Sequence, residues 1–172
     1  HLYGYSQNTM NSPVDIGSKV FSFTYTNTLN TANYTNDYGR TTNDVYYKFT
    51  ITNGMDIIIS HCGSAVTDTY IYLLNSSGSL IASNDDYSGE GKCSSTTNSY
   101  LKMTNLAAGT YYVVSEGYSQ NGDITTTIQG VPKSTIPFVN MGTYSTAFNY
   151  TDTKNTANYG NYYVGRSTND VF

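Results

Sequence analysis

The densest set of side chains that could do chemistry is an acidic loop in the middle of the chain, with Asn84, Asp85, Asp86 and Glu90. Carboxylate and amide oxygens are the ligands that Ca²⁺ takes, about six to eight at a time. The spacing is not that of an EF-hand loop. Asn and Asp also bond to their own backbone in turns, so turn formation is the alternative to a metal site. These four residues are thus a candidate calcium site, and the sequence suggests no other cofactor.

A second pattern, His61 followed by Cys62, brings together a base and a nucleophile. Neighbouring residues on a strand point to opposite faces, so His61 is badly placed to activate Cys62. The only other histidine is His1, and no serine lies in a nucleophile-elbow pattern. The sequence therefore predicts no catalytic residues and a protein that is not an enzyme.

The chain has two cysteines, Cys62 and Cys93. A cysteine pair in a chain rich in Thr, Asn and Tyr is typical of a disulfide formed in an oxidising compartment. The alternative is two unrelated buried thiols. A bridge would close a loop of about 30 residues and contribute about 3 kcal/mol in the chain-entropy account.

Tyrosine dominates the aromatic residues, with 19 copies against 6 Phe and no Trp. Tyrosine is rigid and amphipathic and is common in binding surfaces. Five tyrosines fall in expected loops or at outward strand positions and could stack on a carbohydrate or a protein: Tyr34, Tyr38, Tyr46, Tyr87 and Tyr118. The alternative is that they cover the outer faces of a β-sheet.

Charge and hydropathy exclude two classes of partner. The net charge is −4 and the eight basic residues are scattered, so no basic face exists for a phosphate backbone. No apolar run approaches the roughly 18 residues of a membrane helix; the longest is residues 57–59, three isoleucines. No signal peptide is visible, and a chain starting at His1 suggests a mature or excised fragment.

The elements that must position these residues are all strands. Charged residues make up only 12% of the chain, and Tyr, Thr, Asn, Ser and Gly fill much of it, which favours strands and turns. Residues 19–25 alternate between two faces, and residues 26–44 form a long polar loop. Asn53-Gly54 is the strongest hairpin signal, and the isoleucine run predicts a central strand covered on both faces. The remaining expected strands are residues 45–52, 55–61, 69–74, 80–83, 100–106, 110–116 and 123–129, which together predict an all-β, antiparallel sandwich or barrel.

The chain also contains an internal repeat. Residues 140–159 match residues 15–34 at an offset of 125, including the shared word Asn-Thr-Ala-Asn-Tyr. After one inserted residue, residues 165–171 match residues 39–45 at an offset of 126. The expected organisation is therefore an N-terminal segment at 1–12, a sandwich at 13–130, a linker at 131–137 and an incomplete second repeat at 138–172.

An incomplete module cannot bury its apolar face alone. We therefore expect residues 138–172 to pair with a neighbouring copy of the repeat, for example by adding the segment 144–150 as a strand to a sheet edge. Such pairing would join copies of the module into a tandem array or a fibre.

Four words in order resemble one known family. They are residues 42–50 (TNDVYYKFT), 68–74 (DTYIYLL), 78–86 (GSLIASNDD) and 108–114 (AGTYYVV), and over residues 13–130 they resemble the bacterial pre-peptidase C-terminal domain. The resemblance implies a jelly-roll-like β-sandwich that serves as a non-catalytic module in secreted bacterial proteins, beside peptidases or in large surface proteins. It also implies relatives that bind collagen or calcium. The two cysteines and the loop at 26–44 depart from the commonest pattern of the family.

The expected function is that of a non-catalytic extracellular repeat of a bacterial surface protein or fibre, acting in structure, assembly or adhesion. The alternative is an accessory protein- or polysaccharide-binding module of a secreted peptidase or other hydrolase. The expected partners are neighbouring copies, and a host or matrix protein or a glycan.

Overall fold

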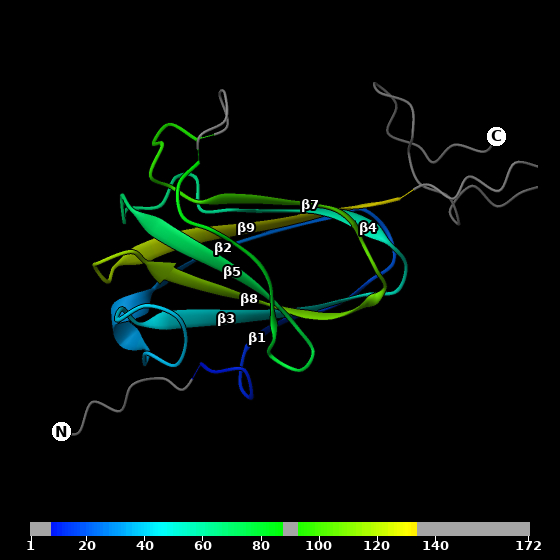
Figure 1. Cartoon of the computed structure of the whole chain (residues 1–172), viewed down its shortest axis with the longest axis horizontal. Helices are drawn as coiled ribbons and strands as arrows, with labels where there is room; N and C mark the ends of the chain where they lie inside the picture. Colours follow the sequence, from blue (N-terminus) through cyan, green and yellow to red (C-terminus); the bar gives the residue numbers. More distant parts are fainter. Residues whose placement is uncertain (1–7, 88–92, 134–172) are drawn as a thin grey trace, which may run out of the picture. The chain divides into compact units, whose positions relative to one another are not determined.

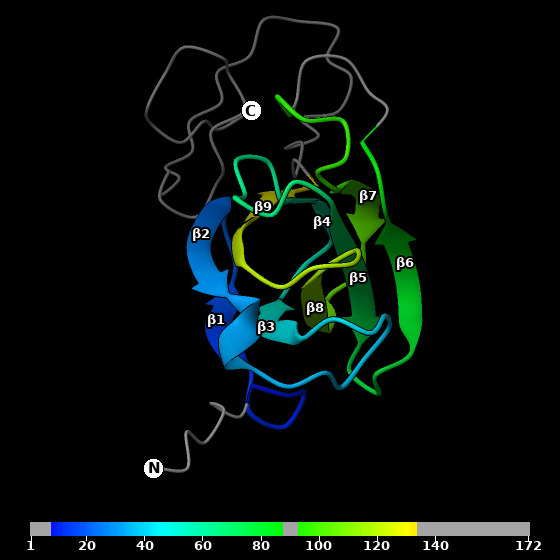
Figure 2. The same cartoon turned by 90° about the vertical axis from the view of Figure 1, so that its left-hand side faces the viewer.

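The computed structural model describes residues 8–87 and 93–133, which form two facing β-sheets (Figure 1). The first sheet has the order β1-β3-β8-β5-β6 and the second the order β2-β9-β4-β7. Figure 2 looks nearly along the strands and shows the two layers with the core between them. The elements are β1 (Val14–Lys19), β2 (Phe23–Asn30), the 3₁₀ turn η1 (Thr31–Asn33), β3 (Asp44–Ile51), β4 (Met55–Ser60), β5 (Thr69–Asn75), β6 (Leu80–Asn84), β7 (Tyr100–Leu106), β8 (Gly109–Gly117) and β9 (Asp123–Pro132). The prediction of an all-β sandwich is confirmed.

The core follows from the alternation of apolar residues along the strands. Every second residue of β3, β4 and β5 points between the sheets, and most of these side chains have no exposed surface. The central members are Val45, Tyr47, Phe49, Ile51, Met55, Ile57, Ile59, Ile71, Leu73, Val113 and Ile128. β4 lies between β9 and β7, as predicted for a central strand, but Ile58 on its outer face is only half-buried.

Connections between strands cross from one sheet to the other more often than the sequence suggested. Among the described strands, only β5 and β6 are consecutive and paired, through a turn in which the Asn75 side chain accepts bonds from the Ser77 and Ser79 amides at 2.9 Å. The predicted hairpin at Asn53-Gly54 is wrong, because β3 pairs with β1 and β8 whereas β4 pairs with β7 and β9. The Asn-Gly turn carries the chain between the layers.

The predicted strand at residues 19–25 is also wrong. β1 ends at Lys19 in one sheet and β2 begins at Phe23 in the other, so the chain must turn between them. Val20 and Phe21 lie in this turn and are about half exposed, at 49% and 50%. The β1–β3 pair is parallel, in contrast to the other described pairs, and its register shifts between Asp15 and Gly17.

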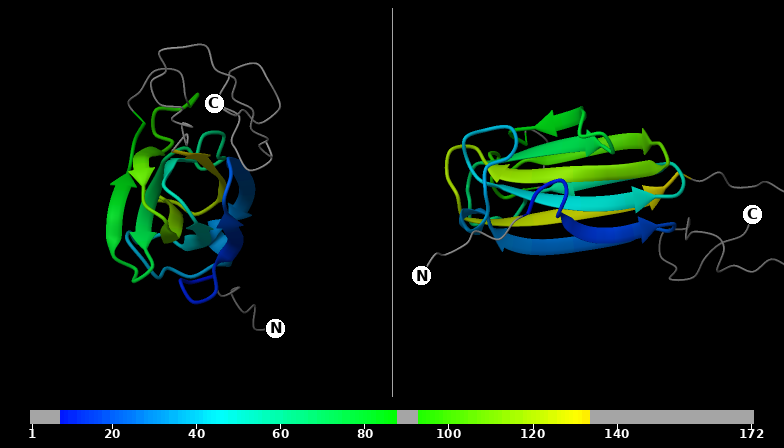
Figure 3. Two further views of the ribbon diagram at one scale, coloured as in Figure 1. Left: turned by 90° about the vertical axis from the view of Figure 1, so that its right-hand side faces the viewer. Right: turned by 90° about the horizontal axis from the view of Figure 1, so that it is seen from below.

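The predicted loop at 26–44 is largely ordered by pairing. β2 continues to Asn30 because its outward threonines bond across the strand pair to β9, with Thr26 Oγ1 3.0 Å from Thr127 Oγ1 and Thr28 Oγ1 2.8 Å from Thr125 Oγ1. η1 follows, and only residues 34–43 form a loop. This stretch leads into β3 at the same end of the sandwich as the turn that follows β8, as the right-hand view of Figure 3 shows.

Candidate functional site

Three carboxylates meet at the end of the first sheet where β5 begins and β6 ends. Ligand atoms of Asp68, Asp85 and Asp86 all lie within 4.8 Å of one another. β5 and β6 pair with Ile71 opposite Asn84, and this register places the residue before β5 beside the residues that follow β6. The structure thus brings together two of the four predicted metal ligands and adds Asp68, which sequence reasoning missed.

The other two predicted ligands stand apart from this set. Asn84 Oδ1 accepts a hydrogen bond of 2.9 Å from the Tyr100 amide, so this side chain holds β7 to the end of β6. Glu90 lies outside the described residues. The hairpin symmetry about the turn at 75–79 is the signal that could have identified Asp68 from the sequence.

The electrostatics of the three aspartates fit a bound cation. Burial, and then the charge of Asp86, raise the pKa values of Asp68 and Asp85, while the Arg40 guanidinium lowers them. One carboxylate oxygen of Asp68 and one of Asp85 are buried and have no hydrogen-bond partner among the described residues. Three carboxylates with oxygens left over have the donor chemistry of a hard divalent cation such as Ca²⁺.

Arg40 lies against this acidic set. Its Cζ is 3.4 Å from the ring centroid of Tyr118 and 4.7 Å from that of Tyr70, and its Nη2 is 3.6 Å from Asp85 Oδ2. Both rings therefore hold the guanidinium by cation–π contact. The backbone N–H of Arg40 donates to both oxygens of Glu116, at 3.1 and 3.2 Å.

Beneath Arg40 lies a pair of buried acids that the sequence did not reveal. Asp44 and Glu116 are directly paired across β3 and β8, and neither has exposed surface. Asp44 Oδ2 accepts from the Asp37 and Tyr38 amides at 2.6 and 2.7 Å. Burial, and then the hydrogen bond to Asp44, raise the pKa of Glu116 to about 8. Glu116 therefore holds a proton at neutral pH and shares it with Asp44, whose own pKa burial also raises.

The five tyrosines considered for binding do not form one surface. Tyr46 is buried, with 3% exposure, because Met10, Tyr38, Tyr72 and Tyr112 pack over the outer face of the sheet around it. Its predicted outward exposure is therefore wrong. Three others make half-buried internal contacts: Tyr34 packs against the core, Tyr38 against Tyr72 at 5.0 Å between centroids, and Tyr87 against Tyr100 at 4.9 Å.

Tyr118 is the remaining member of that set, and it is 40% exposed. One face of its ring is covered by Arg40. A binding role for any of the five stays a prediction.

His61 forms a buried polar chain rather than a catalytic pair. His61 Nε2 is 2.8 Å from Ser115 Oγ, which is 2.9 Å from Thr126 Oγ1, and none of the three side chains is exposed. Burial lowers the pKa of His61 to about 3, so the imidazole is neutral. His61 Nδ1 has no hydrogen-bond partner among the described residues, and so no carboxylate orients the ring as in a catalytic triad. The chain of hydroxyls and imidazole ties the two sheets together.

The predicted disulfide is confirmed. Cys62 and Cys93 are bonded, with their Cα atoms 4.9 Å apart. The bond ties the segment after β4 to the segment that precedes β7, and it leaves neither thiol free to react. No helix in the described part of the chain is long and apolar enough to cross a membrane.

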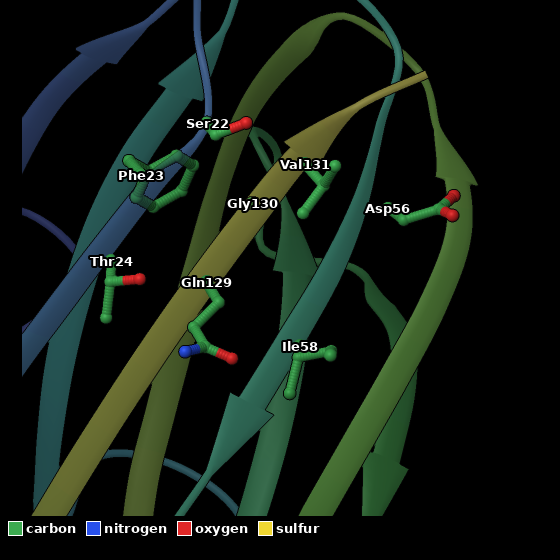
Figure 4. Close-up of a pocket in the computed structure, with 8 residues that line it drawn as sticks. All are labelled: Ser22, Phe23, Thr24, Asp56, Ile58, Gln129, Gly130 and Val131. Atoms are coloured by element: carbon green, nitrogen blue, oxygen red, sulfur yellow. The ribbon is translucent and has the colours of Figure 1, made fainter. Parts of the chain in front are cut away.

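A shallow groove of about 330 Å³ lies on the outer face of the second sheet (Figure 4). It runs across β2, β9 and β4 and is lined by Ser22, Phe23, Thr24, Asp56, Ile58, Gln129, Gly130 and Val131. Its wall is partly apolar, because Val131 is 56% exposed.

Comparison with solved structures finds folds of the same kind at low sequence identity. The pre-peptidase C-terminal domain of a Bacillus anthracis collagenase is 18% identical, with a TM-score of 0.44 over 74% of this chain and 96% of that one. A periplasmic inhibitor of g-type lysozyme from Aeromonas hydrophila is 9% identical, with a TM-score of 0.42 over 73% and 98%. A Paenibacillus barengoltzii β-glucosidase is 12% identical, with a TM-score of 0.36 over 72% of this chain and 13% of the enzyme.

No curated protein matches the chain in sequence. The profile of the bacterial pre-peptidase C-terminal domain matches residues 43–117, from the residue before β3 to the end of β8. This span includes three of the four words on which the resemblance was based, and nearly all of the fourth. The chain therefore contains a bacterial pre-peptidase C-terminal domain, a non-catalytic β-sandwich module.

Proposed function

We propose that the chain is an extracellular structural repeat of a bacterial surface protein or fibre, acting in assembly or adhesion. The observation that carries this proposal is the partial second copy at residues 138–172, which follows a disulfide-closed sandwich. A disulfide favours an oxidising compartment. The described polar clusters support the same reading, because His61 and Ser115 stabilise the interior and have no exposed surface for a substrate.

Electron microscopy of the purified 172-residue chain tests this function. Regular fibres or linear arrays would support assembly through the repeat. Monodisperse single particles over a wide range of protein concentration would argue against it and favour a tethered module.

The second candidate is an accessory module that binds a protein or a polysaccharide beside a secreted hydrolase. The groove across β2, β9 and β4 favours it, because Phe23, Ile58 and Val131 offer apolar surface next to the amide of Gln129. Calorimetric titration with denatured collagen and with soluble glycans tests it, using Val131→Asp as the variant and Leu80→Asp, an exposed residue on the other sheet, as the matched control. Binding that both variants retain would remove the groove from consideration.

We also propose that Asp68, Asp85 and Asp86 bind calcium. Their unpartnered oxygens and their raised pKa values support this site. A ligand that binds only the folded state raises the melting temperature by mass action. We expect millimolar Ca²⁺ to raise the Tm of the native chain but not that of Asp86→Asn, with Asp123→Asn, an exposed residue at the start of β9, as the control. An unchanged Tm in the native chain would exclude the metal.

A further inference from the structure

The longest repeated word of the chain marks an anchor of the sandwich. In the first copy it is Asn30-Thr31-Ala32-Asn33-Tyr34, which forms η1. Asn30 Oδ1 accepts a bond of 3.0 Å from the Ala32 amide and so caps the turn. Thr31 is fully buried: its N–H donates to the Gly122 carbonyl at 2.9 Å, and its Oγ1 accepts from the Gly122 N–H at 3.0 Å. Residues 155–159 repeat all five side chains.

The inward face of β2 is repeated as well. The Phe23 ring lies over Gly130 of β9 so closely that a Cβ on Gly130 would be 2.2 Å from Phe23 Cε1. Tyr25 packs edge-on to Tyr47 of β3, with 6.1 Å between the ring centroids. At an offset of 125, residues 148 and 150 are again Phe and Tyr.

The outward face of β2 and the bulge of β1 follow the same rule. Thr26 and Thr28, which bond to threonines of β9, recur as Thr151 and Thr153. Gly17, at the register shift of β1, has a φ of +82° that favours glycine, and residue 142 is again Gly. The repeated residues are therefore the ones that hold β1, β2 and η1 on the sandwich.

β1 and β2 are edge strands, one in each sheet, and they cover β3 and β9. Within these 172 residues, the second copy extends only to the position of Tyr46 and contains no counterpart of β9. Residues 138–159 thus carry the contacts for an edge whose partner strand is present only in the first copy. Edge strands with these contacts are the usual means of strand exchange between protomers.

We propose that residues 138–159 of one copy replace β1 and β2 of a second copy, so that they pair with its β3 and β9. This inference rests on the proposed assembly function and names its contact surface. Two differences favour the chain's own β2: Leu29, which packs against the core, corresponds to Lys154, and Asp15, whose Oδ2 is 2.6 Å from Lys48 Nζ, corresponds to Asn140. The exchange therefore increases when a chain's own β2 is weakened.

Disulfide trapping in the full chain tests the register. Thr28 and Thr125 are directly paired, so Thr28→Cys with Thr125→Cys should form a bond within one chain and report the native β2. Thr153→Cys with Thr125→Cys should instead form a bond between chains, seen as covalent dimers and larger species on a non-reducing gel and as a linked peptide by mass spectrometry. Asp152→Cys with Thr125→Cys is the matched control, because position 152 corresponds to Asn27, whose partner is Thr126 and which faces the other way.

A second pair of variants tests the competition between the two strands. Adding Phe23→Ala to the Thr125/Thr153 cysteine pair weakens the chain's own β2 and should increase the covalent dimer. Adding Phe148→Ala weakens the incoming strand and should decrease it. The melting curve of each variant before oxidation shows that the sandwich is folded.

Each outcome decides the inference. Dimers linked between positions 125 and 153, well above the position-152 control, support exchange. A 125–153 bond within one chain, or no bond above that control, overturns it. Fibres seen by electron microscopy without this bond would overturn the exchange and leave the assembly function standing, whereas single particles without the bond would remove both.

Discussion

Ser115 and Glu116 are consecutive residues of β8, and they serve two different kinds of buried polar site. Ser115 points between the sheets and bonds to His61 and Thr126, a chain of neutral groups. Glu116 points to the outer face, beneath Arg40, and shares a proton with Asp44. The comparison shows two ways to bury polar groups: neutral partners that need no charge, and acids that stay protonated because burial penalises their charged form.

The two sites are expected to respond to pH in opposite directions. The inner site loses stability when His61 is forced to gain a proton, and the outer site loses stability when Glu116 is forced to release one. The following tests separate these responses, from the largest expected effect to the smallest.

Replacement of His61 by alanine should have the largest effect, a loss of about 3 kcal/mol in the free energy of unfolding, because it opens a cavity in a fully buried position. Ser115→Ala, which removes one hydroxyl from the same chain, should lose only about 1 kcal/mol. Urea unfolding at pH 7 measures both. A loss below that of Ser115→Ala would show that His61 is not what joins the sheets.

Acid should weaken the inner site. The folded pKa of His61 is about 3 against 6.5 when exposed, so the unfolded chain binds the extra proton between these values. Stability is therefore lost as pH falls from 6.5 towards 3, by up to about 1.4 kcal/mol per pH unit. Urea unfolding at pH 7, 6, 5 and 4 should show a shallower decline for His61→Gln than for the native chain. Equal slopes would contradict the prediction.

Alkali should weaken the outer site. The pKa of Glu116 is raised from 4.5 to about 8 on folding, so between these values the folded chain holds a proton that the unfolded chain has released. Stability falls as pH rises through this window. Glu116→Gln keeps an acceptor for the Arg40 amide and a donor for Asp44, so its Tm should exceed that of the native chain by a few degrees at pH 8 and by little at pH 5. A Tm advantage that does not change with pH would contradict proton sharing.

The smallest effect is expected at the loop over the outer site. Arg40→Lys keeps the positive charge and the backbone donor to Glu116 but loses the planar contact with Tyr118 and Tyr70. We expect a loss of about 0.5–1 kcal/mol by urea unfolding. Tyr118→Leu, which removes the exposed ring, should produce a similar loss, and the double variant should add little to either. Fully additive losses would show that the two side chains act separately.

Much of the fold was predictable because strand alternation is local. Residues 45–52 and 69–74 were expected as strands and are found within one residue of β3 and β5. Sheet assignment was not predictable in this way. Asn53-Gly54 has the turn chemistry of a hairpin, but the same turn also suits a crossing between layers, and only the pairing of β4 with β9 decides between them.

The candidate sites show the same division. Asp85 and Asp86 stood out because they are adjacent in the chain, whereas Asp68 joins them only through the register of β5 and β6. Asp44 and Glu116 are 72 positions apart in numbering and meet only because β3 pairs with β8. Tyr46 appeared to be an outward residue because the sequence does not show that Met10 and Tyr38 cover that face.

By itself the sequence determined the all-β class, the cysteine pair, the family resemblance and the internal repeat, because each depends on residue type and spacing along the chain. The tertiary structure decided which strands share a sheet, which acids meet and which tyrosines are covered. It also showed why the repeated words are the ones they are: Asn30, Thr31 and Phe23 hold edge strands to β9 and its preceding turn. Those contacts join residues about 100 positions apart, and spacing along the chain carries no record of them.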